Sequence, residues 1–211
     1  MVPEAPFERV ETGVRPCGRG WFVVNAREVP WFESDGCGFY ATFEPEDARF
    51  DQVGLGLGIL RPGEPSALYH GEDAQEDFLV LSGECLLLIE GEERRLRAWD
   101  FVHCPPWTEH IFVGAGDGPC LILGVGARRT GRGIRYPVNE LALSTAPASR
   151  RRRRTRRRPT PVSATTSLSS VRPSSPGRDT LHAVRGSAPL RGLLVFYGRL
   201  AAVTKSVFAS M

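Results

Sequence analysis

Turn signals recur about every eight to twelve residues through the first two thirds of this chain, with short apolar runs between them. This spacing is typical of an antiparallel sandwich or barrel, because it leaves little room for helices between consecutive turns. Strands are predicted at residues 21–25, 53–60, 78–81, 85–90, 101–104, 111–113 and 120–125. Turns are predicted at residues 61–65, 82–83, 90–91 and 115–119. The sequence therefore predicts an all-β fold.

The charge of the chain changes sign near residue 143. Residues 1–143 carry 23 of the 24 acidic and 13 of the 27 basic residues, a net charge of −10, whereas residues 144–211 carry +13. Of the 35 residues from 144 to 178, 28 are Ser, Thr, Pro or Arg. Such a segment has too little apolar surface to bury to offset the entropy lost when a chain becomes ordered. We therefore predict an N-terminal arm over residues 1–37, a β-barrel over 38–127, a flanking segment over 128–143 and a disordered basic tail over 144–211.

Eight arginines of this tail lie at residues 150–154 and 156–158. Such a run can bind nucleic acid through charge alone, without reading its sequence. No aromatic residue is interleaved with the arginines and no nucleic-acid-binding motif follows them, so we expect no nucleic-acid partner. Because the chain's 27 basic residues include a single lysine, Lys205, a second hypothesis is that the segment after residue 143 is translated out of frame from a GC-rich gene.

Features that would point to a membrane or to secretion are missing from the sequence. No stretch approaches the roughly 18 consecutive apolar residues of a membrane span, and Glu4, Glu8 and Glu11 stand where a secretion signal would be basic and then apolar. The five cysteines are odd in number and form no C-x-x-C pair, which favours reduced thiols over disulfides or a zinc site. We expect a soluble, cytoplasmic protein without a membrane partner.

Four side chains in two segments could converge on a metal ion. His70 and Glu72 are two residues apart, so on one strand their side chains leave from the same face. Glu76 would approach from the neighbouring strand beyond a bend, and His110 from the hairpin opposite. Two imidazoles with one or two carboxylates suit Fe(II), Mn(II), Zn(II) or Ni(II), and the absence of a sulfur ligand argues against copper(I). Glu72 could instead turn to solvent, whereas Glu76 precedes an apolar run and would need a partner if buried.

The segment HGEDAQEDFLVLSG, residues 70–83, resembles the first motif of the cupin superfamily, commonly written G-x5-H-x-H-x3,4-E-x6-G. His70, Glu72, Glu76 and Gly83 stand at the family's intervals, with Glu72 in place of the second histidine. The resemblance spans roughly residues 50–127, and the phrases QEDFLVLSGE and RAWDFVHCPP are similar to small single-domain bacterial cupins. It implies a jelly-roll β-barrel and a divalent metal ion held by His70, Glu72, Glu76 and His110.

The second cupin motif, G-x5-P-x-G-x2-H-x3-N, resembles WDFVHCPPWTEHIFVG, residues 99–114, through Pro105 and His110. Trp99 and Trp107 replace its two glycines, and Gly114 replaces the asparagine. If the turn before His110 requires a positive φ, tryptophan adopts it at a cost of about 1 kcal/mol or more. Trp107 therefore either marks a remodelled turn and site, or caps the barrel mouth as a packing or stacking surface.

The resemblance leaves two functions open. In one, the barrel is a metal-dependent enzyme that acts on a small polar molecule, and dioxygenase, isomerase and lyase chemistry all occur on cupins. In the other, the same pocket binds or senses a small molecule without turnover. Cupins are commonly homodimers, and the apolar run 21–24 of the N-terminal arm looks suited to covering a sheet edge, so we expect a homodimer.

Overall fold

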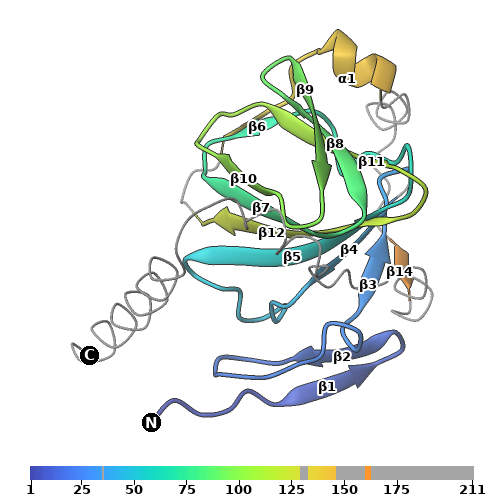
Figure 1. Ribbon diagram of the computed structural model, residues 1–211. Coiled ribbons are helices and arrows are strands. Elements are labelled where there is room, and N and C mark those ends of the chain that lie inside the picture. Colours follow the sequence, from blue (N-terminus) through green and yellow to red (C-terminus); the bar gives the residue numbers. More distant parts are fainter. Residues whose placement is uncertain (35, 129–132, 146–159, 163–211) are drawn as a thin grey trace, which may run out of the picture. The chain divides into compact units, whose positions relative to one another are not determined.

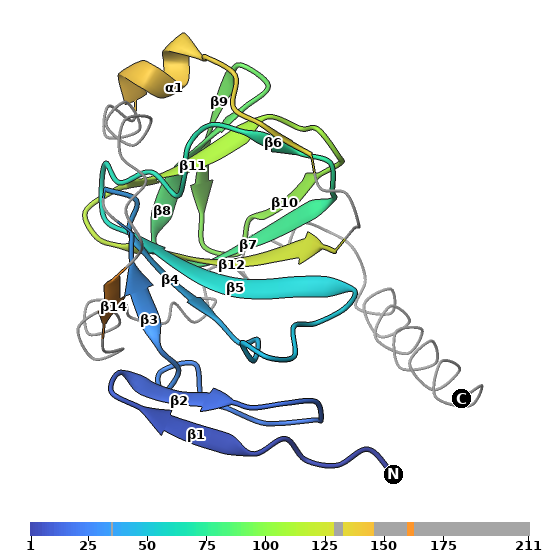
Figure 2. The same ribbon diagram turned by 180° about the vertical axis from the view of Figure 1, so that it is seen from behind.

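Two antiparallel β-sheets face each other in the computed structural model, which describes residues 1–34, 36–128, 133–145 and 160–162 (Figures 1 and 2). The described elements are β1 Phe7–Val10, β2 Gly13–Pro16, β3 Trp31–Glu33, β4 Phe39–Thr42, β5 Val53–Leu60, β6 Gly71–Glu72, β7 Glu76–Ser82, β8 Glu84–Ile89, β9 Glu92–Arg97, β10 Phe101–Cys104, β11 His110–Ala115, β12 Cys120–Ala127, β13 Ile134–Arg135, α1 Glu140–Thr145 and β14 Thr160–Val162. Among the described residues, no helix has the length and the hydropathy that crossing a membrane would take.

The large sheet has the strand order β10-β7-β12-β5-β4-β3-β14, and the small sheet has the order β11-β8-β9. Alternate side chains of both sheets point inward, so that Val80 on β7, Leu87 on β8 and Phe112 on β11 pack into one cluster between the sheets. Their neighbours in the chain, Leu88 after Leu87 on β8 and Ile111 before Phe112 on β11, point to the other face and belong to a different cluster. The predicted all-β, jelly-roll barrel is confirmed.

Local sequence explains how the small sheet forms. At the turn between β8 and β9, Glu90 has a φ of 50° and Gly91 a φ of 80°, as in the two-residue hairpins that match the twist of their strands. This turn was predicted, but β9 was not, because its sequence EERRLR carries almost no apolar residue and its side chains are mostly exposed. Pairing with the apolar β8 along all six residues makes it a strand.

Two further clusters lie on the outer faces of the sheets. Outside the small sheet, Ala142 of α1 packs with Tyr69, Leu88 and Ile111. On the outer face of the large sheet, Trp31 of β3 packs with residues of β4 and β5. Val24 and Val29, from the segment before β3, pack on the same cluster. The barrel therefore has a covering layer on each side, one from the N-terminal segment and one from α1.

The strand predicted at residues 21–25 is wrong. Trp21 makes only an isolated bridge with Glu4, and residues 22–25 belong to no strand. Val23 is 82% exposed, whereas Val24 packs on the outer cluster of the large sheet, so the segment attaches by side chains rather than by a hydrogen-bonded ladder. The arm's strands are instead β1 and β2, which form a separate two-stranded sheet.

Most of the predicted tail lies outside the described residues, including the arginine runs at 150–154 and 156–158. Within the described part, residues 144–145 end α1, and β14 pairs with β3 in register from Thr160 opposite Glu33 to Val162 opposite Trp31. The three residues of β14 thus extend the large sheet. No sequence signal indicated this strand.

Candidate metal centre

His70 and His110 are brought together by the backbone. His70 lies directly before β6, His110 is the first residue of β11, and the two form an antiparallel bridge. The His110 N–H donates to the His70 carbonyl at 2.8 Å, and the His70 N–H donates to the His110 carbonyl at 3.2 Å. Their ring centroids lie 5.1 Å apart as a result. The pairing that joins the two predicted motifs therefore also sets the spacing of the two imidazoles.

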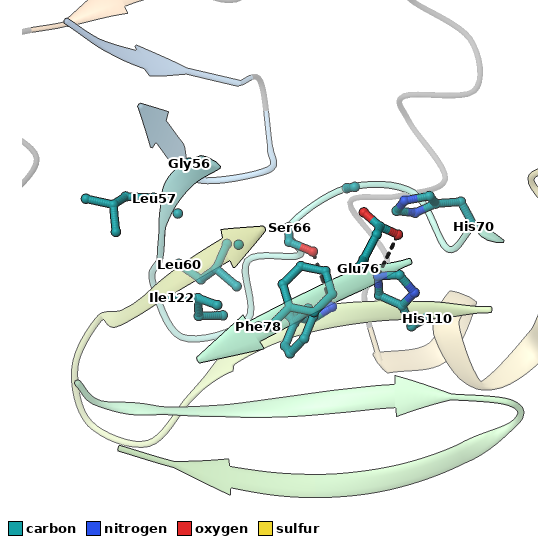
Figure 3. A pocket seen from close by; sticks show the side chains of 13 residues that line it. Gly56, Leu57, Leu60, Ser66, His70, Glu76, Phe78, His110 and Ile122 are labelled. Carbon is teal, nitrogen blue, oxygen red and sulfur yellow. Dashed lines mark hydrogen bonds and ion pairs between the residues drawn. The ribbon is translucent and has the colours of Figure 1, made fainter. Parts of the chain in front are cut away.

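Glu76 supplies the third side chain of the cluster from the first position of β7 (Figure 3). One ligand atom each from His70, Glu76 and His110 lies within 4.8 Å of the others, and Glu76 Oε2 is 3.7 Å from His110 Nε2. The His110 side chain is 3% exposed, that of His70 13% and that of Glu76 17%. The cluster is therefore largely shielded from solvent, and three of the four residues predicted as metal ligands meet there.

The fourth predicted residue, Glu72, lies beside this cluster. Its Oε1 is 3.9 Å from Nε2 of His70, and its side chain is 26% exposed. Its position on β6 is fixed by hydrogen bonds on two sides: the Trp107 N–H donates to the Glu72 carbonyl at 2.6 Å, and Ile134 of β13 pairs with it. The structure thus puts Glu72 next to His70, at the edge of the three-residue cluster.

Hydrogen bonds at the far ring nitrogens orient both histidines. Nδ1 of His70 lies 2.7 Å from the Leu68 carbonyl oxygen, and Nδ1 of His110 lies 3.1 Å from the Thr108 carbonyl oxygen. Because a carbonyl oxygen only accepts, each Nδ1 must carry the hydrogen. In the neutral rings Nε2 then keeps its lone pair. This is the tautomer that a metal-binding histidine uses when its other nitrogen donates to the protein.

Electrostatics also keep these rings neutral. Burial lowers the pKa of His110, and burial together with the neighbouring His110 lowers the pKa of His70. Cys104, opposite Glu76 in the ladder between β10 and β7, stays a thiol because burial, followed by Glu76, raises its pKa to about 12. The site thus offers two neutral imidazoles beside the Glu76 carboxyl group, and no thiolate.

Trp107 keeps the turn that the family builds with glycine. Its φ is 72°, and Trp99, at the other glycine position, has a φ of 76°. The Trp107 carbonyl accepts a hydrogen bond from Nη2 of Arg135 at 3.1 Å, and the Arg135 guanidinium lies 5.2 Å from the centroid of the indole ring. The indole also packs against Gly133, where an added Cβ would come within 2.7 Å of it. Of the two expectations for Trp107, the turn is therefore not remodelled, and its ring serves as a packing surface.

The segment held by Trp107 was missed by sequence reasoning. Strand β13 pairs with β6, and the Tyr136 ring that follows lies 5.9 Å from the ring of His70. Arg135 also pairs with Glu109 at 3.3 Å. Nothing in the local sequence GIRYP indicates this position, because it depends on pairing between segments about sixty residues apart.

A cavity of about 240 Å³ opens next to the cluster, inside the barrel. Its walls are apolar side chains and strand glycines, with polar groups only at His70, Glu76, His110 and Ser66. The lining residues are Gly56, Leu57, Gly58, Leu60, Ser66, Ala67, His70, Glu76, Phe78, His110, Phe112, Ile122 and Gly124. Such a concave, mostly apolar space with a few converging polar groups is typical of a small-molecule site.

Comparison with known proteins agrees with this architecture. The family model described as "Cupin domain" matches residues 56–126. Gentisate 1,2 dioxygenase 1 from Aquipseudomonas alcaligenes is 30% identical over 66 residues, which cover 31% of this chain. The match spans 19% of that relative's length, about one fifth.

Two solved structures are similar to this chain. A sugar phosphate isomerase from a cupin superfamily, from Silicibacter pomeroyi, is 28% identical over 46% of this chain and 65% of that one, with a TM-score of 0.41. A polyketide cyclase from Streptomyces resistomycificus is 16% identical over 62% of this chain and 96% of that one, with a TM-score of 0.49. With the barrel, the bridged motifs and the family match in agreement, this chain is a cupin-domain protein whose cupin domain covers residues 56–126.

Proposed function

We propose that this protein binds a divalent metal ion through His70, Glu76 and His110, and that the ion holds a small molecule in the adjoining cavity. The observation that carries the proposal is the pair of Nδ1 hydrogen bonds to the Leu68 and Thr108 carbonyls. They give both imidazoles the tautomer with a free Nε2, and both rings belong to the same three-residue cluster. Unlike an isolated packing histidine, His110 also turns its Nε2 toward a carboxyl group, 3.7 Å from Oε2 of Glu76.

The size of the cluster fits one ion after a small adjustment. Nitrogen and oxygen ligands lie about 2.1 Å from a divalent ion such as zinc, so two ligand atoms of one ion are at most about 4.2 Å apart. His110 Nε2 and Glu76 Oε2, at 3.7 Å, already satisfy this limit. The full spread of 4.8 Å would need a shift of well under 1 Å. The carboxylate also gives the site the negative charge that a dication requires.

We propose Glu72 as a fourth ligand that closes the site on the side of His70. Its Oε1 is already within 3.9 Å of His70 Nε2, which is inside the same limit for two atoms bound to one ion. Two imidazoles and two carboxylates suit Fe(II), Mn(II), Zn(II) or Ni(II). A bound ion supplies positive charge that polarises an oxygen atom of the small molecule.

The chemistry of the cavity bears on which reaction is possible. The only titratable side chains among its lining residues are His70, Glu76 and His110, the three proposed ligands. Isomerase and lyase reactions need a positioned acid or base within hydrogen-bond reach of the substrate. Oxidation at the ion, as in a dioxygenase, and binding without turnover need no such group among the lining residues.

Oxygen consumption separates these two functions. Iron-loaded protein is mixed with candidate oxygen-donor ligands, and oxygen uptake is followed with an electrode while thermal stabilisation is measured in parallel. Uptake that is lost in His110→Ala supports the enzyme. Stabilisation without uptake or product supports the binding module, and neither response with any ligand contradicts a small-molecule function.

We also propose that the protein is a cytoplasmic homodimer. Support for the dimer comes from β10, the end strand of the large sheet, where Phe101 is 64% exposed. Phe101 stands opposite Leu79 of β7, which stands opposite Leu123 of β12, so that an apolar row crosses three strands to the sheet edge. Such an exposed edge with an apolar face is suited to pairing with a second copy.

A further inference from the structure

A second cavity adjoins the first and contains the only arginine that lines either of them. The two cavities share Gly56, Glu76, Phe78 and Gly124 in their walls, so they adjoin each other at these residues. The second, of about 260 Å³, extends from Glu76 across the large sheet to Thr42, Glu44 and Arg128. A ligand that binds at the His70, Glu76 and His110 cluster and extends past Phe78 would reach Arg128.

Glycines on two neighbouring strands keep this passage open. Gly54 and Gly56 on β5 stand opposite Gly126 and Gly124 on β12. A Cβ at position 54 would lie 2.7 Å from Nη2 of Arg128, so a side chain there would displace the guanidinium. Gly54 lies two strands away from Glu76, and adjacent strands are about 4.8 Å apart, which puts the guanidinium about 10 Å from the strand that carries Glu76.

The hydrogen bonds of Arg128 indicate which kind of ligand group this end of the second cavity could bind. Nη2 of Arg128 pairs with Glu44, whose side chain is only 9% exposed. Nε of Arg128 is buried and has no hydrogen-bond partner among the described residues. Nε is therefore enclosed by the protein, and a ligand acceptor can meet Arg128 only at the guanidinium atoms that line the cavity. A hydrogen bond to a charged group there contributes about 1.5–3 kcal/mol of affinity.

Resting on the metal site proposed above, we propose that the cavity takes a ligand with two polar ends: oxygen atoms that bind the metal ion, and an uncharged acceptor, a carbonyl or hydroxyl oxygen, to which the guanidinium of Arg128 donates. The body between them is apolar, to match Leu60, Phe78 and Ile122. A second anion is disfavoured, because Glu44 already neutralises the guanidinium and a ligand carboxylate or phosphate would lie beside it.

Three hydroxamic acids of equal length test this assignment, since a hydroxamate head binds divalent metals through two oxygens. The probes are hexanohydroxamic acid, its analogue with a ketone at C5, the carbon before the terminal methyl, and glutaric monohydroxamic acid, whose carboxylate carbon is also C5. Calorimetry on the metal-loaded protein should show the ketone probe binding about tenfold tighter than the methyl-ended probe. The carboxylate probe should bind no tighter than the methyl-ended one.

Two variants locate the effect. In Arg128→Met/Glu44→Gln, which removes both members of the buried pair, the ketone and methyl-ended probes should bind equally. In Glu44→Gln alone, the freed guanidinium should make the carboxylate probe the tightest of the three. The control, Arg94→Met/Glu92→Gln, removes an exposed pair on β9 and should keep the wild-type ratios.

Metal content, measured in every sample, distinguishes a failure of the Arg128 assignment from a failure of the proposed metal site. A wild-type protein that holds metal but shows no preference for the ketone, or binds none of the probes, overturns the role of Arg128 and leaves the metal site standing. A preference that persists in Arg128→Met/Glu44→Gln also overturns it. A wild-type protein that holds no metal overturns the proposed function, and the ligand assignment with it.

Discussion

The imidazole of His110 is fixed through a hydrogen bond to the residue two positions before it: Nδ1 lies 3.1 Å from the carbonyl oxygen of Thr108. Thr108 is itself held by the same turn, since its N–H and hydroxyl both donate to the Pro105 carbonyl, at 3.1 and 2.8 Å. The turn that contains Trp107 therefore determines which ring nitrogen of His110 faces the cluster.

His110 should be the residue that most affects metal retention. It is the one proposed ligand from the second motif, whereas the first motif supplies His70, Glu72 and Glu76. We expect His110→Ala to lose the ion under mild dialysis, and Glu72→Ala to weaken binding by only about tenfold, because a flanking ligand can be replaced by water. Competition with a chromogenic chelator measures both. Equal retention by His110→Ala and the wild type would contradict the ligand set.

The metal-free protein should lose stability as the pH falls from about 7 to 5. Burial holds the pKa of His70 and His110 below its ordinary value, whereas in the unfolded chain histidine titrates near pH 6.5. Below that pH the unfolded state takes up protons that the folded state does not, so acid favours unfolding. Denaturant titrations of chelator-treated protein measure the loss. The variant His70→Gln/His110→Gln should lose less; an identical loss would assign the effect to other groups.

The two tryptophans with positive φ should respond differently to glycine. At both positions glycine relieves a backbone strain of about 1–2 kcal/mol. Trp99→Gly should therefore stabilise the protein, because no arginine stacks on Trp99 in the described part of the chain. Trp107→Gly also loses the Arg135 contact, worth about 0.5–1 kcal/mol, and the packing on Gly133, so its stability should change little while metal binding is retained.

Thermal unfolding and limited trypsin digestion distinguish these two variants. In Trp107→Gly, cleavage after Arg135 should become faster, since the indole no longer holds the segment around β13. In Trp99→Gly the cleavage rate should match the wild type. Equal digestion of both variants would show that Trp107 does not hold this segment.

Phe101→Glu should separate the proposed dimer into monomers. The substitution puts a charge into the apolar row formed with Leu79 and Leu123 at the sheet edge. Light scattering should give the mass of two chains for the wild type and of one chain for the variant. Val138→Glu, at another exposed apolar position, should leave the mass unchanged. A monomeric wild type, or a dimeric Phe101→Glu, would argue against this interface.

Strands that carry their own apolar pattern were predictable from the sequence. β5 and β10 have the predicted bounds, and β7, β8, β11 and β12 overlap the predicted ranges. β3 and β4 were missed although Trp31, Phe39 and Ala41 are buried. The other missed strands around the site have little apolar character or are short: β9 is stabilised by its partner β8, and β6 and β13 are two residues each. Their existence depends on pairing between distant segments, which local periodicity does not record.

In the candidate site, too, some residues were predictable from the sequence and others were not. His70, Glu76 and His110 were found from motif spacing, because the spacing reflects strand pairing that the fold imposes. Arg135 and Tyr136 were not found, because each contacts the site through the chain's return after β12. The tautomers of the histidines also depend on backbone carbonyls, whose direction only the folded turns define.

Elemental analysis of the full chain, purified without a metal-affinity tag, tests the central claim most directly. The His70, Glu76 and His110 cluster predicts close to one equivalent of iron, manganese, zinc or nickel per chain, retained through gel filtration. Protein that carries no divalent metal as purified, and takes up none when Fe(II), Mn(II), Zn(II) or Ni(II) is supplied, would contradict the account.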